Sequence, residues 1–206
     1  MNRTEEIINI LESFIEPKCE LVFHNNYELL VSVILSAQTT DKHVNLITPK
    51  LFNKCKDIYE LNNADKKDIE EIIKPLGLSK TKSGNLKNMA NVIVNNYQGN
   101  IPNDFNELIK LPGVGRKTAQ VVLALGFNIP SLPVDTHVTR VSKMLGIVNK
   151  ESSVLEIEET LKKQLKKEMW IAAHHLLLLF GRYYCKAKNP ECNNCKLIKY
   201  CKKQNY

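Results

Sequence analysis

Apolar residues recur every three or four positions through nearly the whole 206-residue chain, which is the spacing of one face of a helix. In the first such segment this face contains Ile7, Leu11 and Phe14, and Thr4 precedes it as the expected N-cap. No segment alternates apolar and polar residues as a half-buried strand does. We therefore predict an all-α fold, with further helices over residues 27–38, 41–52, 67–74, 82–97, 105–110, 116–127, 136–145, 154–165 and 170–184.

Proline and glycine residues separate these helical segments. Pro75 and Gly77 end one helical pattern, and Pro102 precedes another. The strongest interruption runs from Pro130 to Pro133, between two clearly helical stretches, and it marks the best internal boundary. No repeat of fixed period and no low-complexity tract is found.

The chain is basic, and the excess of positive charge is concentrated near its end. Lys and Arg outnumber Asp and Glu by 29 to 22, and residues 182–206 contain seven basic side chains against Glu191, a balance of +6. A basic surface concentrates polyanions, and nucleic acid is the commonest of these. Many basic tails are only solvated, but the charge favours a nucleic-acid partner.

The sequence lacks the features of a membrane-spanning or secreted chain. Its longest apolar candidate, residues 29–37, is interrupted by Ser32 and falls far short of the roughly 18 residues of a spanning helix. The first residues mix Arg3 with Glu5 and Glu6 and have no apolar core of the kind found in a secretory signal. We therefore expect a cytoplasmic protein with reduced thiols.

Four of the six cysteines lie close together, in the pattern C-x6-C-x2-C-x5-C, at Cys185, Cys192, Cys195 and Cys201. Clustered thiols in a reducing compartment indicate a metal, and four thiolates suit either tetrahedral zinc or an iron-sulfur cluster. The usual zinc ribbon has two close C-x2-C pairs, whereas this chain has one. The other two, Cys19 and Cys55, are expected to be small buried apolar residues.

The most informative segment is LIKLPGVGRKTAQVVLALG at residues 108–126, where a short helix ends in a Pro-Gly-Val-Gly turn and an apolar helix begins at once. Glycine lets the backbone turn tightly and approach another molecule. The amides of Gly113, Val114 and Gly115 would then face outward at a helix N-terminus, which favours an anion such as phosphate. A simple turn is the alternative, but the apolar flanks and the basic pair Arg116 and Lys117 favour a phosphate-binding hairpin.

Two residues of this region have both a structural and a chemical interpretation. Lys117 is either a solvated surface lysine or an accessible amine nucleophile, and its position alone leaves both open. Asp135 precedes an apolar helical pattern, so it is expected to cap that helix. A fixed carboxylate there can also accept a proton or stabilise positive charge.

The turn with its flanks looks like the helix-hairpin-helix motif of DNA repair glycosylases, and LPVDTHVTRV at residues 132–141 looks like its catalytic continuation. Together with LLVSVILSAQTTD at residues 29–41 and the four cysteines, these motifs make the chain resemble the endonuclease III family over nearly its whole length. The resemblance implies that Lys117 is a Schiff-base nucleophile, that Asp135 is the catalytic carboxylate, and that the cysteines hold a 4Fe-4S cluster.

The same resemblance assigns DNA contacts. It places Gln38 in the gap left by a flipped nucleotide, Asp41 beside the base pocket, and Leu78 as a wedge between bases, although these residues could also belong to a plain loop and a helix cap. His137 is expected either at the abasic sugar or phosphate or as a hydrogen-bonding residue at the helix start. Phosphate contacts are expected from the hairpin and the basic loop, namely Gly113, Val114, Gly115, Arg116, Lys196 and Lys199.

These implications together describe a bifunctional DNA glycosylase and abasic-site lyase that excises oxidised or ring-saturated pyrimidines and cleaves 3′ to the site by β-elimination. The resemblance implies a central helical domain over residues 19–130, a cluster domain from residues 1–18 plus 131–206, and a DNA groove between them. We expect a monomer that acts on damaged duplex DNA at the nucleoid.

Two other functions fit parts of the pattern. Adenine-removing mismatch glycosylases share the hairpin and cluster, but they lack the hairpin lysine and usually continue into a further domain, whereas this chain ends just after Cys201. A non-catalytic DNA-binding protein would not need Lys117 and Asp135 together. Departures from the family pattern are slight: Gln120 stands where Asn is frequent, and Phe180 where His is common.

Overall fold

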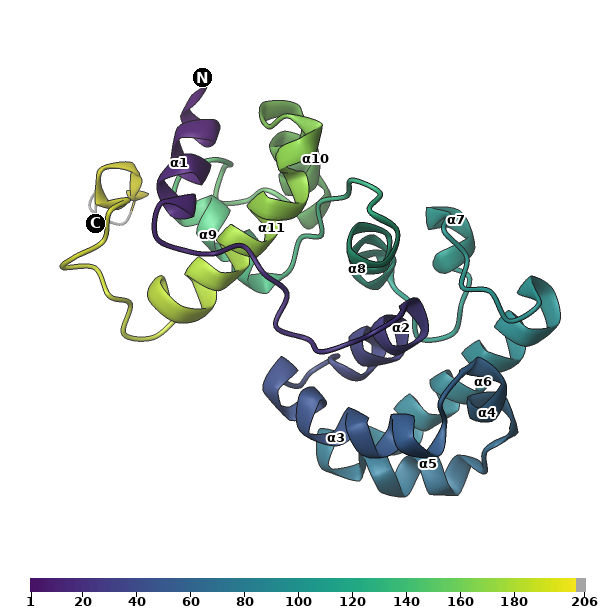
Figure 1. Cartoon of the computed structure of the whole chain (residues 1–206). Coiled ribbons are helices and arrows are strands. Elements are labelled where there is room, and N and C mark those ends of the chain that lie inside the picture. The colour runs from purple at the N-terminus through teal and green to yellow at the C-terminus, as the bar shows by residue number, and fades with distance from the viewer. Residues whose placement is uncertain (203–206) are drawn as a thin grey trace. The chain divides into compact units, whose positions relative to one another are not determined.

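The computed structural model describes residues 1–202, and these form helices without any strand (Figure 1). The prediction of an all-α fold is confirmed. The helices are α1 (Arg3–Glu12), α2 (Asn26–Leu35), α3 (Asp41–Lys54), α4 (Ile58–Asn63), α5 (Lys66–Ile73), α6 (Ser79–Tyr97), α7 (Phe105–Leu108), α8 (Arg116–Phe127), α9 (Thr136–Met144), α10 (Val154–Gln164) and α11 (Trp170–Leu179). Within residues 1–202, no helix combines the length and the apolar character needed to cross a bilayer.

Several helix limits differ from those expected. The helix α4 is absent from the prediction because its six residues are too few to show a helical period, although Asp57 caps it through the Glu60 N–H. The N-cap of α1 is Asn2, which forms a capping box with Glu5, so the assignment of Thr4 as the cap is wrong. The helix expected over residues 170–184 changes at Phe180 into a π-helical turn, Phe180–Tyr184.

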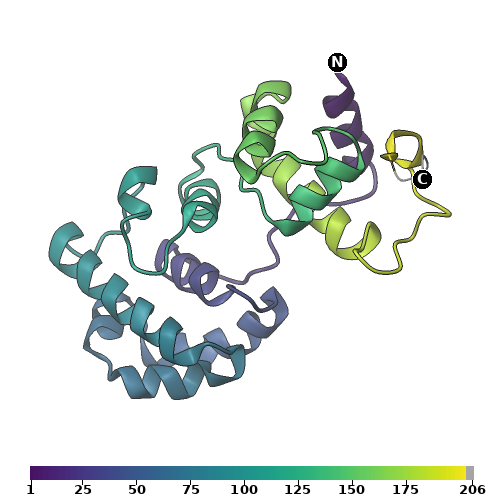
Figure 2. The same cartoon turned by 180° about the vertical axis from the view of Figure 1, so that it is seen from behind.

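The chain forms two compact units, one made of Met1–Cys19 with Pro130–Tyr206 and the other of Glu20–Ile129. Each has its own apolar core. In the unit Glu20–Ile129, α2 packs against α3, α6 and α8, while α6 also packs against α4 and α5 (Figures 1 and 2). Because α2 is covered by neighbours on several sides, it is apolar almost all round, with every residue from Leu29 to Leu35 buried.

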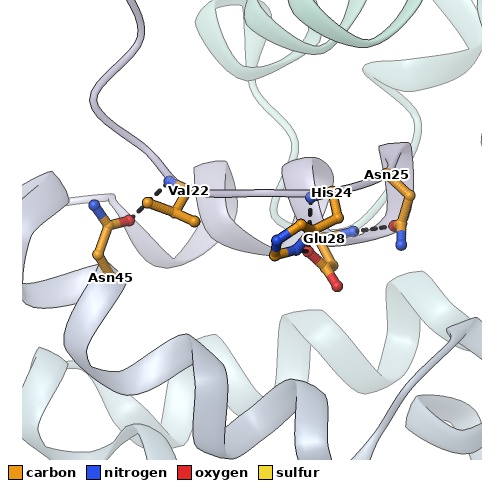
Figure 3. Close-up of polar contacts among 5 residues, drawn as sticks. All are labelled: Val22, His24, Asn25, Glu28 and Asn45. Atoms are coloured by element: carbon orange, nitrogen blue, oxygen red, sulfur yellow. Dashed lines mark hydrogen bonds and ion pairs between the residues drawn. The ribbon is translucent and has the colours of Figure 1, made fainter.

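Hydrogen bonds hold the segment that leads into α2, as Figure 3 shows. The Val22 N–H donates to Asn45 Oδ1 on α3 at 2.9 Å, and Asn45 Nδ2 donates to the Glu20 carbonyl at 2.7 Å. At the helix start, Asn25 accepts from the Glu28 N–H, and Glu28 in turn accepts from the His24 N–H at 2.8 Å. These contacts fix where α2 begins, and therefore where the loop that follows it emerges.

In the other unit, α11 packs against α1 and α9, and α10 packs against the same two helices. His174 and His175 are buried on α11, and His174 Nδ1 lies 2.7 Å from the Pro133 carbonyl oxygen. This contact ties α11 to the proline-rich segment that precedes α9.

Of the two isolated cysteines, Cys55 is fully buried as expected, whereas Cys19 is only half-buried, so the expectation for Cys19 is wrong.

Candidate functional site

The hairpin between α7 and α8 is a tight turn built around Gly113. This glycine has φ +81°, and a Cβ placed on it would lie 2.9 Å from Asn85 Cβ on α6, so the close packing of hairpin against helix requires glycine. The Val114 N–H donates to the Leu111 carbonyl at 3.0 Å, and its side chain is buried. The expectation that the Val114 amide faces outward is therefore wrong, because the turn itself uses that donor.

The N-terminus of α8 keeps the features of an anion site. Gly115 is its N-cap, and among the described residues no side chain caps this end of the helix. Gly113 and Gly115 are both exposed. The N–H groups at the start of α8, together with the positive end of the helix dipole, are therefore suited to a phosphate oxygen.

Arg116 and Lys117 begin α8 and are exposed. The Arg116 guanidinium lies over the Phe105 ring at 5.1 Å, and this cation–π contact braces α8 against α7. Lys117 is exposed in the first turn of α8, so its amine is accessible to an incoming substrate. Gln120, one turn further along, is buried and therefore turned towards the core.

Gln38 and Leu78 share an unusual backbone conformation. Both have positive φ, 58° at Gln38 and 52° at Leu78, although neither is glycine. Left-handed residues with large side chains are uncommon and concentrate at functional positions. Both side chains are exposed, and Asp41, expected beside the base pocket, is the half-buried first residue of α3. The sequence pattern does not predict the strained backbone of Gln38 and Leu78.

Asp135 caps α9, as the sequence predicts. Its Oδ1 accepts the Val138 N–H at 2.8 Å, and the side chain is half-buried. His137 is the second residue of the same helix, and burial lowers the pKa of its imidazole, while the nearby Asp135 carboxylate opposes that shift. Gly181 allows this packing, since a Cβ there would come within 3.0 Å of His137 Cβ.

The four clustered cysteines line one cavity of about 480 Å³. Apolar side chains, among them Phe14, Phe180 and Ile198, complete its wall. Burial raises the pKa of the Cys185 thiol, and the Arg140 guanidinium partly offsets this effect. Arg140 also donates to the carbonyls of Gly181 at 2.6 Å and Cys185 at 2.8 Å, which anchors the start of the cysteine segment.

The donor set and the cavity fit a thiolate-ligated group, since all four cysteines line the same cavity. Within residues 1–202, no three Cys, His, Asp or Glu side chains gather closely enough to hold a metal ion. The four cysteines therefore line a common cavity, but their sulfurs are not close enough together to form a coordination sphere.

The expected phosphate-binding lysines already have partners within the protein. Lys196 Nζ lies over the Phe14 ring at 4.8 Å, and Lys199 Nζ lies 3.1 Å from Glu6 Oε1. Both side chains of this ion pair are exposed, and solvent screens such pairs, so Lys199 can exchange Glu6 for a phosphate at little cost. Lys203, which belongs to the same basic segment, lies outside the described residues.

The site residues are divided between the two units. Gln38, Asp41, Leu78, the hairpin and Lys117 belong to Glu20–Ile129. Asp135, His137, the cysteines and the basic loop belong to the other unit.

Two positions that the sequence analysis did not single out are Lys82, which contacts the Leu78 turn, and Arg140, which contacts the cysteine segment. A lysine or arginine at helical spacing gives no sign that it is buried or bonded.

Comparison with known proteins gives consistent matches. Residues 31–167 match the model of the HhH-GPD superfamily of base excision DNA repair proteins. The chain is 46% identical to endonuclease III of Bacillus subtilis over 191 residues, which cover 93% of this chain and 87% of that protein. It is also similar to an endonuclease III bound non-covalently to DNA, at 42% identity and a TM-score of 0.93, covering 100% of this chain and 98% of that one. A covalently trapped endonuclease III–DNA intermediate matches at 41% identity and a TM-score of 0.94, with the same coverage.

Proposed function

The chain belongs to the endonuclease III family of the HhH-GPD superfamily, and we propose that it excises oxidised pyrimidines from duplex DNA and then cuts the strand at the abasic site. It is a bifunctional DNA glycosylase and AP lyase that binds DNA. The observation that carries the assignment of the nucleophile is the position of Lys117. It is exposed in the first turn of α8, at a helix N-terminus that no side chain of the described residues caps.

The reaction starts at the sugar that carries the damaged base. The neutral Lys117 amine attacks C1′, the bond from C1′ to the base breaks, and the base leaves with the bonding electrons and takes up a proton. The nitrogen then loses one proton, and the bond from C1′ to O4′ breaks as O4′ takes up a proton, which gives a protonated imine between Lys117 and C1′. Removal of a C2′ proton then expels the 3′ phosphate, so the strand is cut on the 3′ side.

Asp135 supports these steps as a fixed carboxylate. It stabilises positive charge that develops on the sugar and accepts a proton during imine formation. The 2.8 Å hydrogen bond from the Val138 N–H to Oδ1 holds its side chain in place, and the second carboxylate oxygen remains for this role. Capping and catalysis are therefore compatible in one residue.

A base inside a duplex cannot reach Lys117 until it is flipped out. Unstacking costs a few kcal/mol, and inserted side chains offset part of that cost. Gln38 and Leu78 are suited to this role because both are exposed on left-handed backbone. Phosphates on either side would be held by the start of α8, by Arg116 and by Lys196 and Lys199.

The four cysteines would hold a 4Fe-4S cluster, which supplies iron–thiolate bonds that fold the basic segment. Support comes from their shared cavity and their pattern, which contains a single C-x2-C pair. The residues of the reaction are elsewhere in the chain, so no step is assigned to this group. We propose further that the protein acts as a monomer in the cytoplasm, at the nucleoid.

Borohydride trapping tests the assignment of Lys117. On an oxidised-pyrimidine duplex, wild-type protein should form a covalent adduct, whereas Lys117→Gln should form none and still bind the duplex within a few-fold, because only imine formation requires the amine. Lys110→Gln is the matched control, since this exposed lysine lies on the same hairpin and pairs with Glu107. An adduct formed by Lys117→Gln would show that another amine is the nucleophile.

A further inference from the structure

The turn that carries Leu78 has two consecutive residues with positive φ, and of these Leu78 is strained. Gly77 has φ 70° and ψ 161°, a region that is essentially restricted to glycine, and Leu78 follows with φ 52° and ψ 28°. They join the 3-10 turn Lys74–Leu76 to α6. A leucine rarely adopts this conformation, so the surrounding structure must impose it.

Burial of the leucine does not explain the strain. The Leu78 side chain is 54% exposed, so the strained backbone holds an apolar side chain out towards solvent. Leucine is among the residues most often buried, and here the conformation acts against that tendency. Strain that presents an apolar group outward indicates a contact with another molecule.

Lys82 contacts the backbone at both ends of the pair Gly77 and Leu78. Its N–H donates to the Leu78 carbonyl at 2.9 Å, and its Nζ donates to the Leu76 carbonyl at 3.0 Å. One further hydrogen bond, from the Gly77 N–H to the Lys74 carbonyl at 3.2 Å, closes the preceding turn. A single residue thus donates to the carbonyl that precedes Gly77 and to the carbonyl of Leu78.

The Lys82 side chain is buried where it makes these contacts. Only 4% of the residue is exposed, whereas its neighbours Lys74 and Lys80 are exposed. Burial lowers the pKa of Lys82, as expected where a cation loses water. A buried ammonium needs a strong acceptor, and the Leu76 carbonyl at the C-terminal end of the 3-10 turn supplies one.

We propose that Lys82 is a positioning residue that holds Leu78 ready for insertion between DNA bases. The inference rests on the wedge role given to Leu78 in the proposed function. Without the ammonium, the Leu76 carbonyl loses its partner and the turn can relax from its left-handed conformation. Base unstacking should then weaken, while imine formation at Lys117 should continue on DNA that needs no unstacking.

A fluorescent duplex tests this directly. The probe is a duplex with a tetrahydrofuran abasic analogue and 2-aminopurine as the opposite base, which becomes brighter when it is unstacked. At saturating wild-type protein the signal should rise. It should fall by most of that rise with Leu78→Ala, and by at least half with Lys82→Met. Lys82→Arg, which keeps a cationic donor, should retain at least half of it.

The double variant distinguishes positioning from a general structural role. If Lys82 acts through Leu78, Lys82→Met should have little further effect in a Leu78→Ala background. Lys87→Met is the matched control, because Lys87 also lies on α6 and donates to backbone carbonyls, those of Leu61 and Asn62. It should match wild type, and the Lys82 and Lys87 single variants should trap within twofold of wild type on single-stranded abasic DNA.

Each failure has its own signature. A full signal from Lys82→Met, with the signal lost in Leu78→Ala, overturns the inference alone. A full signal from Leu78→Ala overturns the wedge role and the inference with it, and absence of trapping by wild type overturns the proposed function. If Lys82→Met does not fold, Lys82→Gln, which is neutral and one atom shorter, is judged by the same criteria.

Discussion

Substitution of Asp135 separates the stability of a helix cap from the chemistry of a carboxylate. The cap is a single hydrogen bond of 2.8 Å from the Val138 N–H to Asp135 Oδ1. Asparagine keeps an oxygen acceptor and loses only the attraction between the charge and the helix dipole, about 0.5 kcal/mol. Alanine loses both the charge and the cap, about 1.5 kcal/mol in total. For a chain of this length these values lower Tm by about 1–2 °C and about 3–6 °C.

Activity should follow a different order from stability. If the carboxylate takes part in proton transfer, Asp135→Asn and Asp135→Ala should both lose about 10² or more in rate, equivalent to roughly 2.7 kcal/mol of barrier. Single-turnover strand cleavage on a damaged duplex measures the rate, and circular dichroism during heating measures Tm. Asp135→Ser, another good N-cap, is the control and should be folded but slow.

The reasoning fails if rate and stability change together. An Asp135→Asn protein that cleaves at the wild-type rate, beside an Asp135→Ala protein slowed only in proportion to its lower Tm, would leave the residue with the capping role alone.

Three further outcomes follow from the site. Gly113→Ala should lower both Tm and the affinity for duplex DNA, because φ is +81° and the new Cβ would meet Asn85. Gly115→Ala has open space around it and should lower Tm by less, since only the N-cap preference for glycine over alanine is lost. Fluorescence anisotropy at several salt concentrations should give a salt slope that flattens by up to about 0.9 in Lys196→Ala and in Lys199→Ala, and an unchanged slope would remove that lysine from the interface. Purified protein should be brown with about four iron and four sulfide per chain, and a colourless protein with one zinc would contradict the cluster.

Features that depend on neighbours along the chain could be predicted from the sequence. Helical spacing of apolar residues led to the all-α fold, and Asp135 was expected at the N-cap where it is found. The Pro-Gly-Val-Gly turn and the cysteine pattern carried the resemblance to the endonuclease III family, because both are short segments whose residue types and spacing suffice. Lys117 could be placed at the start of α8 for the same reason.

Features that depend on distant packing were decided by the tertiary structure alone. The spacing of residues does not reveal that the Val114 amide donates a hydrogen bond within its own turn or that Lys82 is buried. It also does not reveal the ion pair between Glu6 and Lys199, which lie near opposite ends of the sequence. The left-handed conformation of Leu78 is likewise unfavourable for leucine taken by itself. Local preference sets which helices form, but strain and burial require contacts that exist only once those helices have packed.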